Sequence, residues 1–367
     1  MDLKLHQSDV LRELSLVQGV VERRSPIPIL ANILLEASGD RLRLTATDLD
    51  MTVMTSCPAE VRAEGRLTVA SSVFQDLVRN LPEEEFTVRL DGEGVVISSG
   101  RFTSRMAILD AGEFPTVPEE PQSDGFSLSL PLLQEMFSRV AFAITKEDPK
   151  FQLNGALVRF LPGELEIAAT DGHRLAVVRA RTDGGDPPFE RQLFPRKLIA
   201  EFSRFDGERV LFSVHENHIG FRMGTRSLIS RIVDLRFPQY EKVIVRDNPH
   251  RARVGRSELL TALRRVSLLA QEKSRGVRFR FGSDGELTLV SIGQELGTAE
   301  EVLAIDYQGA PIEMALNAVY VIDVLNVLDT EQVEIQLKDS ATQCVIVPVD
   351  DDERLEEYIY VVMPMRV

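Results

Sequence analysis

The sequence predicts an α+β fold of three tandem domains, each with two helices packed on antiparallel sheets. Three observations support this prediction. A chain of 367 residues is long enough for two to three domains. A pattern of helix-like and strand-like segments recurs three times, about 120 residues apart. The composition, 44% hydrophobic and 27% charged, is typical of a globular protein with ample material for buried cores.

Each repeat opens with a predicted helix, in which a start signal precedes apolar residues at helical spacing. The start signals are Ser8, Pro131 and Ser257. Equivalent apolar positions within the helices are Leu11, Leu133 and Leu260. The expected helices cover residues 10–24, 131–146 and 257–275.

A strand follows each of these helices, because apolar and polar residues alternate there before a turn. The strands with their turns cover residues 41–51, 164–175 and 286–296. A second helix comes next, at residues 70–81, 195–205 and 316–329. It precedes another strand, at residues 86–90, 210–214 and 333–337, and a short hairpin partner. Each repeat therefore reads helix–strands–helix–strands, as a doubled half-unit would.

Two Pro-rich, polar stretches separate the repeats, at residues 114–125 and 245–251. They divide the chain into three expected domains, residues 1–120, 124–247 and 251–367. Within each domain the helices should cover one face of a sheet.

The net charge of −15, spread evenly, would argue against a nucleic-acid partner, because phosphate binding requires Lys and Arg. The six predicted helices nevertheless carry a net charge of about +4, which leaves the rest of the chain strongly acidic. If the helices share one face, that face could meet phosphates. Interspersed charge is also the pattern of an ordinary solvated helix surface, so both interpretations stay open.

Catalytic and metal-binding motifs are absent from the sequence: there is no GxSxG, HExxH or GxxxxGK. Cys57 and Cys344 lie outside any metal-ligand spacing and are expected to be inert in a reducing cytosol. His215 and His218 fall in a predicted hairpin, where a metal role is disfavoured. We therefore expect no cofactor and no metal. No signal peptide and no apolar run of about 18–20 residues is visible, which predicts a cytoplasmic protein.

The stretch AATDGHRLAVV, residues 168–178, brings Asp171, His173 and Arg174 together as an active site would. A near-copy, TATDLDM, lies at the same turn of the first repeat. A Thr-Asp pair at the same turn of two repeats is best explained by turn chemistry, in which the Asp side chain bonds nearby backbone N–H groups. The second copy differs in its Gly172-His173-Arg174, so function is expected there and not on the Asp.

Eight stretches, spread over all three repeats, carry a family resemblance. They are PIPILANILLEA (26–37), LTATDLDM (44–51), LNGALVRF (153–160), ATDGHRLAV (169–177), FPRK (194–197), RFPQYEKV (236–243), EKSRGVRF (272–279) and YVVMPMRV (360–367). In order and spacing they resemble the bacterial sliding clamps, the β subunits of DNA polymerase III. The resemblance implies a non-catalytic, head-to-tail homodimer, closed as a ring around double-stranded DNA with helices lining the hole. Its implied clients are the replicative polymerase, the clamp loader and other clamp-binding-motif proteins.

The resemblance implies weak, sequence-independent phosphate contacts, which suit a sliding ring because no register on DNA is favoured. The DNA-binding residues carried over are Arg24, Lys146, Lys150, Phe151, Gln152, Arg196 and Lys197. Ser71 and Ser72 stand where relatives can carry Arg and Lys, and Glu147 where they can carry a neutral amide. Contacts at these three positions are therefore in doubt.

The resemblance also implies a client-peptide pocket between the second and third domains. Its residues are Leu153, Thr170, Gly172, His173, Arg174, Leu175, Pro238, Lys242, Val243, Val361, Val362, Met363, Pro364, Met365 and Arg366. The Leu, Val, Met and Pro side chains would form an apolar slot, and the polar groups would orient an extended peptide. Lys242 stands where relatives can have Arg, which puts a bidentate contact there in doubt.

The implied ring interface joins the first domain of one chain to the third domain of the next. Its residues are Arg105, Met106, Ile108, Leu268, Leu269, Lys273, Glu300 and Glu301. Glu300 and Glu301 are expected to pair with Arg105, and the alternative for Leu268 and Leu269 is ordinary core packing.

Two other functions compete with the clamp. An enzyme would rest on Asp171 and His173 without a recognisable nucleophile motif. A peptide-binding scaffold with no DNA role would explain the pocket but not three repeats with basic helices. A sliding clamp explains all of these features.

Overall fold

The computed structural model describes residues 1–22, 26–119, 126–145, 152–182, 185–272, 274–293 and 297–365. Six α-helices lie in these ranges: α1 (Gln7–Val17), α2 (Ser71–Arg79), α3 (Leu130–Ala141), α4 (Arg196–Phe202), α5 (Arg256–Val266) and α6 (Ala318–Val327). Each follows a strand without a loop. These strands are β1 (Asp2–His6), β6 (Gly65–Ala70), β10 (Ser127–Ser129), β14 (Arg191–Pro195), β18 (His250–Gly255) and β23 (Ile312–Asn317). The doubled half-unit predicted for each repeat is therefore a strand, a helix and the strands that follow.

The first helix of each repeat is shorter than predicted, because buried apolar residues continue beyond its end in turns. Val20, Ile144 and Ala270 are buried, yet they lie outside α1, α3 and α5. The helices as observed hold eight basic and seven acidic side chains, so the predicted helical charge of about +4 is wrong. The difference arises at the helix ends, since α1 includes Asp9 and α4 ends before Arg204.

The chain forms two compact units, and the boundary between them runs through the second repeat. Unit 1 consists of Met1–Pro131, Gly184–Pro188 and Ala200–Ile232. Unit 2 consists of Leu132–Asp183, Phe189–Ile199 and Val233–Val367. The second repeat is divided because its two halves belong to different sheets.

Unit 1 contains an eight-stranded sheet that joins the first and second repeats. Its further strands are β2 (Asn32–Ser38), β3 (Arg41–Thr47), β4 (Met51–Pro58), β15 (Arg209–His215), β16 (His218–Met223) and β17 (Arg226–Arg231), in the order β10-β15-β16-β17-β4-β3-β2-β6. The junction is the antiparallel pair β17–β4. A second sheet adds β5 (Glu60–Ala63), β7 (Glu85–Asp91), β8 (Gly94–Ser99) and β9 (Phe102–Ala107), in the order β5-β1-β7-β8-β9.

Unit 2 contains a nine-stranded sheet that joins the second and third repeats in the same way. Its further strands are β11 (Gly155–Leu161), β12 (Glu164–Thr170), β13 (Arg174–Arg181), β22 (Asp306–Tyr307), β24 (Gln332–Leu337), β25 (Cys344–Val349) and β26 (Leu355–Val362), in the order β14-β11-β12-β13-β26-β25-β24-β18-β22. The junction is β13–β26. The remaining sheet, β21-β20-β19-β23, adds β19 (Gly276–Phe281), β20 (Glu286–Ser291) and β21 (Glu300–Ala304).

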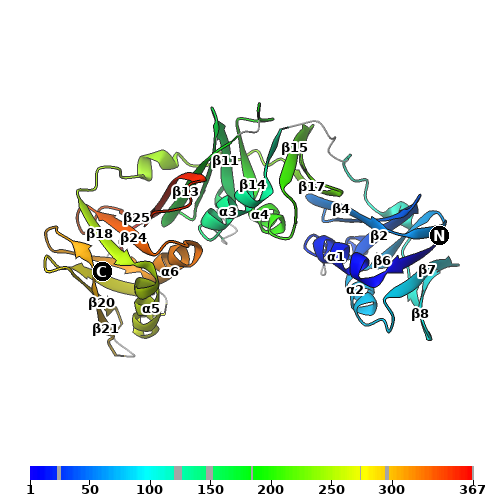
Figure 1. The fold of residues 1–367 in the computed structure, drawn as a ribbon, viewed down its shortest axis with the longest axis horizontal. Coiled ribbons are helices and arrows are strands. Elements are labelled where there is room, and N and C mark those ends of the chain that lie inside the picture. The colour runs from blue at the N-terminus through cyan, green and yellow to red at the C-terminus, as the bar shows by residue number, and fades with distance from the viewer. Residues whose placement is uncertain are drawn as a thin grey trace. The chain divides into compact units, whose positions relative to one another are not determined.

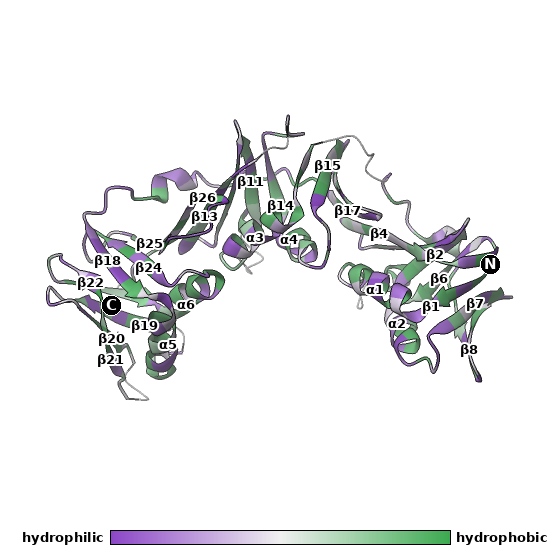
Figure 2. Cartoon of the chain, viewed as in Figure 1, coloured by the Kyte–Doolittle hydropathy of each residue, from purple (hydrophilic) through white to green (hydrophobic). Residues whose placement is uncertain are grey.

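Helices and sheets share an apolar core within each unit. In unit 1, Leu14 of α1 and Phe74 of α2 are fully buried, and α1 packs against α2 and β4. In unit 2, α5 and α6 pack against each other through buried residues such as Leu263 and Val324 (Figure 1). Figure 2 shows α6 as mostly hydrophobic, the strands with both hydrophobic and hydrophilic residues, and the connecting segments as largely hydrophilic. Cys57 and Cys344 lie in these cores.

Candidate functional site

The Thr-Asp turns of the first two repeats have matching hydrogen bonds. Oδ1 of Asp171 accepts the backbone N–H groups of His173, at 2.9 Å, and Arg174, at 3.1 Å. Asp48 accepts the equivalent pair in the first repeat. The hydroxyl of Thr170 donates to the carbonyl oxygen of Arg174, as its counterpart in the first repeat also does. The prediction of turn chemistry at this position is confirmed.

Nine of the predicted pocket residues line one cavity of about 130 Å³ in unit 2. They are Leu153, Thr170, Gly172, Arg174, Leu175, Pro238, Val243, Val361 and Met363. Gln239 and Tyr240, which the sequence did not indicate, complete the lining. The pairing of β13 with β26 places Leu175 opposite Val361, which brings the second and third repeats to the same cavity. The lining is mostly apolar, as a slot for hydrophobic side chains requires.

The other predicted pocket residues do not line this cavity. Those described are His173, Lys242, Val362, Pro364 and Met365, and Arg366 lies outside the described residues. Val362 is fully buried and faces away from the cavity that Val361 lines, because neighbouring residues of a strand face opposite ways. His173 instead stacks on the ring of Tyr320, with the ring centroids 6.5 Å apart.

Arg174 is held rigidly in the cavity wall. Its guanidinium donates to Asp171 at 3.0 Å, to Asp323 at 2.6 Å and to the carbonyl oxygen of Phe142 at 2.6 Å. The same group lies over the rings of Phe142 and Tyr320, at 5.3 and 4.5 Å from their centroids. Arg174 therefore presents a rigid surface to the cavity.

Gly172 leaves space in front of the turn. Its φ is +92°, a conformation that favours glycine, and a Cβ placed there would meet nothing within 4 Å. Leu49 holds the equivalent position in the first repeat with a φ of +79°, and its side chain is 54% exposed. The turn thus accepts a leucine, whose side chain projects into the space that stays open beside Gly172.

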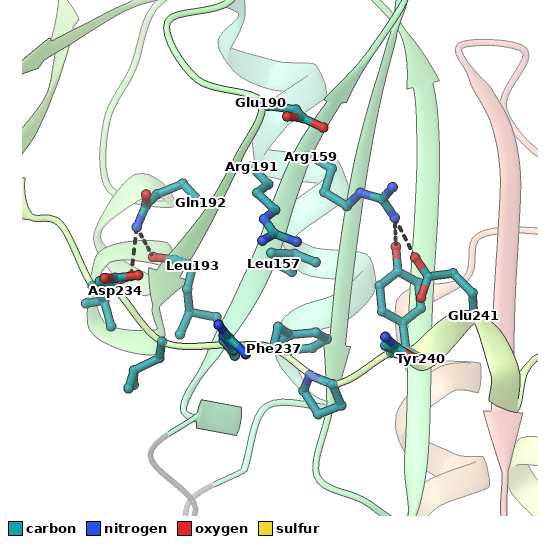
Figure 3. Close-up of a pocket in the computed structure, with 15 residues that line it drawn as sticks. Leu157, Arg159, Glu190, Arg191, Gln192, Leu193, Asp234, Phe237, Tyr240 and Glu241 are labelled. Atoms are coloured by element: carbon teal, nitrogen blue, oxygen red, sulfur yellow. Dashed lines mark hydrogen bonds and ion pairs between the residues drawn. The ribbon is translucent and has the colours of Figure 1, made fainter.

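A larger cavity, of about 590 Å³, borders the first, and Pro238, Gln239 and Tyr240 line both. Strands β11 and β14 and the segment 233–241 enclose it (Figure 3). The Tyr240 hydroxyl donates to the buried carboxylate of Glu166 and accepts from Arg159 at 3.0 Å. Burial and the neighbouring Glu166 raise the pKa of Tyr240 above its ordinary value, so the hydroxyl keeps its proton. These bonds anchor the segment that separates the two cavities.

Three of the predicted DNA contacts lie in the described part of the chain: Gln152, Arg196 and Lys197. All three are exposed. The backbone N–H of Arg196, at the start of α4, donates to the carbonyl oxygen of Asn154, which places the helix start beside the segment of Gln152. Arg24, Lys146, Lys150 and Phe151 lie outside the described residues.

The predicted interface residues lie on or beside two sheet edges. Met106 is on β9, the edge strand of one sheet, and Glu300 and Glu301 begin β21, the edge strand of another. Ile108 follows β9, and Lys273 lies outside the described residues. Within the chain Arg105 already bonds Asp91, at 3.1 Å, so a bond to Glu300 or Glu301 of a partner would have to share or displace this one.

Two exposed apolar side chains accompany these edges. Leu268 is 71% exposed, which excludes core packing for that residue. Phe102, at the start of β9, is 41% exposed and was not indicated by the sequence. Phe102 is recognised from the structure, because an exposed aromatic ring on an unpaired strand edge indicates an interaction surface.

Comparison with known proteins identifies the family. Family models of the DNA polymerase III β subunit match throughout: the N-terminal domain at residues 1–118, the central domain at 127–239 and the C-terminal domain at 241–366. The chain belongs to this family. The three predicted repeats are thus three tandem clamp domains, and the chain is a non-catalytic processivity subunit.

Curated relatives and solved structures agree over the full length. The β sliding clamps of Pseudomonas aeruginosa and Escherichia coli K12 are 35% and 33% identical to the chain, each with 100% of both chains covered. The crystal structure of the P. aeruginosa subunit has a TM-score of 0.92 at 34% identity, again with 100% of both chains covered. A Bartonella birtlesii sliding clamp bound to griselimycin has a TM-score of 0.93 at 30% identity and the same coverage. In the described residues no helix is long and apolar enough to cross a membrane.

Proposed function

We propose that two copies of this chain close head to tail into a ring around duplex DNA and hold client enzymes there through the 130 Å³ cavity. The observation that carries the proposal is a pairing rule that both internal junctions obey. In each repeat, the strands after the first helix form a first half, and the strands after the second helix form a second half. At both junctions, the last strand of the first half of one repeat pairs with the last strand of the second half of the next repeat. The pairs are β4–β17 and β13–β26.

The same rule predicts that two further strand edges, one at each end of the chain's repeats, pair with each other in the dimer. Strand β21 is the first-half edge of the third repeat, and β9 is the second-half edge of the first repeat. In a head-to-tail dimer, β9 of the partner would complete β21, and the other seam would follow by symmetry. Both edges carry exposed backbone groups, which natural proteins rarely leave uncovered.

The junctions also fix the register of the proposed seam. Glu300 is equivalent to Met54 and Val177, and Thr103 is equivalent to Ser227 and Ile359. Because Met54 pairs with Ser227 and Val177 with Ile359, Glu300 should face Thr103 of the partner. Phe102 would then stand opposite Glu301, and Arg105 would be one diagonal step from Glu300 on the same face.

Client binding is assigned to the cavity beside Gly172, with the rigid Arg174 and the apolar Leu175 and Val361 as its walls. DNA binding is assigned to Gln152, Arg196 and Lys197 together with the four residues outside the described ranges. The place of action is the cytoplasm, where a replicating chromosome and its polymerase would be found.

The ring is tested by topology. Labelled protein, loaded on a circular plasmid with a cognate clamp loader and ATP, should stay bound through gel filtration and be lost once the plasmid is linearised. Retention that is equal on circular and linear DNA would show binding without encirclement and would refute the ring.

A further inference from the structure

We propose that the 590 Å³ cavity is a second subsite for client peptides, which receives a residue flanking the motif and binds its carboxylate through Arg191 and Arg236. The proposal rests on the assignment of the smaller cavity to client peptides. It adds a polar recognition element that neither the family resemblance nor the comparisons assign.

The two cavities are connected through a shared wall. Pro238, Gln239 and Tyr240 line both, and Pro238 and Gln239 are exposed. An extended chain anchored in the apolar cavity would therefore reach the larger one by crossing a single exposed segment. The wall is firm, because Tyr240 is tied to Glu166 and Arg159.

The arginines that line the larger cavity differ in whether their side chains already have a partner. Arg159 has its own partners, Glu166 at 3.1 Å and Glu241 at 2.8 Å. The side chains of Arg191 and Arg236 make no hydrogen bond or ion pair with any of the described residues, so both guanidinium groups are available to a ligand.

Two carboxylates limit what the cavity would accept. In Figure 3, Arg191 extends over the floor near Leu157, whereas Glu190 lies at the end away from Tyr240 and Asp234 beside Gln192. A carboxylate arriving over the shared wall would be attracted by the arginines, while Glu190 and Asp234 would repel a longer acidic run. The chemistry fits one Asp, one Glu or a terminal carboxylate, because a guanidinium can bind a carboxylate through two parallel hydrogen bonds.

The apolar floor of the larger cavity favours a peptide as its ligand rather than a small anion. Leu157 and Leu193 come from neighbouring strands, and Phe237 packs against Tyr240 with ring centroids 6.0 Å apart. Such a floor would bury the stem of a flanking side chain while the arginines bind its end.

The experiment compares fluorescein-labelled peptides that contain the clamp-binding motif of the cognate replicative polymerase. One lacks any extension, and the others carry Gly-Ser-Asp-Gly or Gly-Ser-Asn-Gly on either flank. Fluorescence anisotropy with the full chain should give about fivefold tighter binding for Asp than for Asn on one flank, as two partly exposed ion pairs would produce. The Arg191→Ala/Arg236→Ala variant should abolish that ratio and leave the Kd of the unextended peptide unchanged. The matched control Arg66→Ala/Arg89→Ala, which removes two exposed arginines of the first repeat, should keep the ratio.

Failure of this inference and failure of the proposed function give different results. Equal Kd values for Asp and Asn on both flanks, or a ratio that survives the double substitution, would overturn the second subsite while the motif still binds. No binding of the unextended peptide to the folded protein would instead overturn the client cavity itself.

Discussion

Gly172 and Leu49 occupy the same turn of two repeats, and only Gly172 lines the described client cavity. We predict that Gly172→Leu lowers the affinity for a client peptide at least tenfold, because the new side chain would project into the cavity. The fold should survive, because Leu49 shows that a leucine is accommodated at this φ. Peptide titration and thermal unfolding would check both parts. Leu49→Gly is the matched control, and an unchanged Kd for Gly172→Leu would place the peptide elsewhere.

The two thiols offer a test of burial at single residues. Burial raises the pKa of Cys57 and of Cys344 to about 12, and Glu13 adds to the effect at Cys57. Both thiols should therefore stay unreactive toward Ellman's reagent at pH 8 in the folded protein and react fully once it is unfolded. Rapid labelling of the native chain would contradict their burial.

The same shift has a consequence for stability. Because the folded state holds these protons more tightly than the unfolded state, the stabilisation is complete below the ordinary thiol pKa of 9.0. It is then lost as the pH rises toward about 12. Chemical denaturation between pH 8 and pH 11 should show the loss, and Cys57→Ala/Cys344→Ala should show less of it.

At the scale of elements, the β4–β17 junction depends on a side chain of α1. The buried carboxylate of Glu13 accepts from Arg226 at 2.8 and 3.0 Å and from the hydroxyl of Thr55. A helix of the first repeat is thereby linked to a strand of the second.

Removing one partner of the Glu13–Arg226 ion pair should destabilise the protein more than replacing both partners with apolar residues. Among the described residues, Glu13→Ala leaves Arg226 with only the distant Asp206, at 3.8 Å, and should lower the free energy of unfolding by about 3 kcal/mol. Glu13→Leu/Arg226→Met should recover most of the loss, because it removes both charges and keeps apolar volume. Urea denaturation of the two variants would decide, and equal losses would show that the charges themselves are needed.

For the whole molecule, the proposed function requires that the ring close through two identical seams. Leu268→Glu should convert the dimer to a monomer, because it replaces an apolar side chain that the seam would bury with a charged one. Sedimentation at micromolar concentration would measure the change. Val214→Glu, on an apolar side chain outside the seam that is 42% exposed, should leave the dimer intact. A dimeric Leu268→Glu protein would remove Leu268 from the interface.

The sequence by itself determined the three repeats, the order of helices and strands, and the Thr-Asp turns. These features depend on periodicity and on hydrogen bonds between near neighbours, as the matched bonds of Asp48 and Asp171 show. Nine residues around the client cavity were reached through the family resemblance, since their pattern spans distant parts of the chain.

The tertiary structure alone decided how the repeats join. Pairing between β4 and β17, or between β13 and β26, brings together residues far apart in the chain, and no local pattern encodes it. The tertiary structure also decided where α1, α3 and α5 end. Apolar residues beyond each helix are buried as those within it are, so the apolar pattern does not mark the helix end. The sequence did not indicate Tyr240, whose role depends on the hydrogen bond that its hydroxyl donates to Glu166, far away in the sequence. Contacts of this kind depend on which strands lie side by side, and that is settled only when the whole chain has folded.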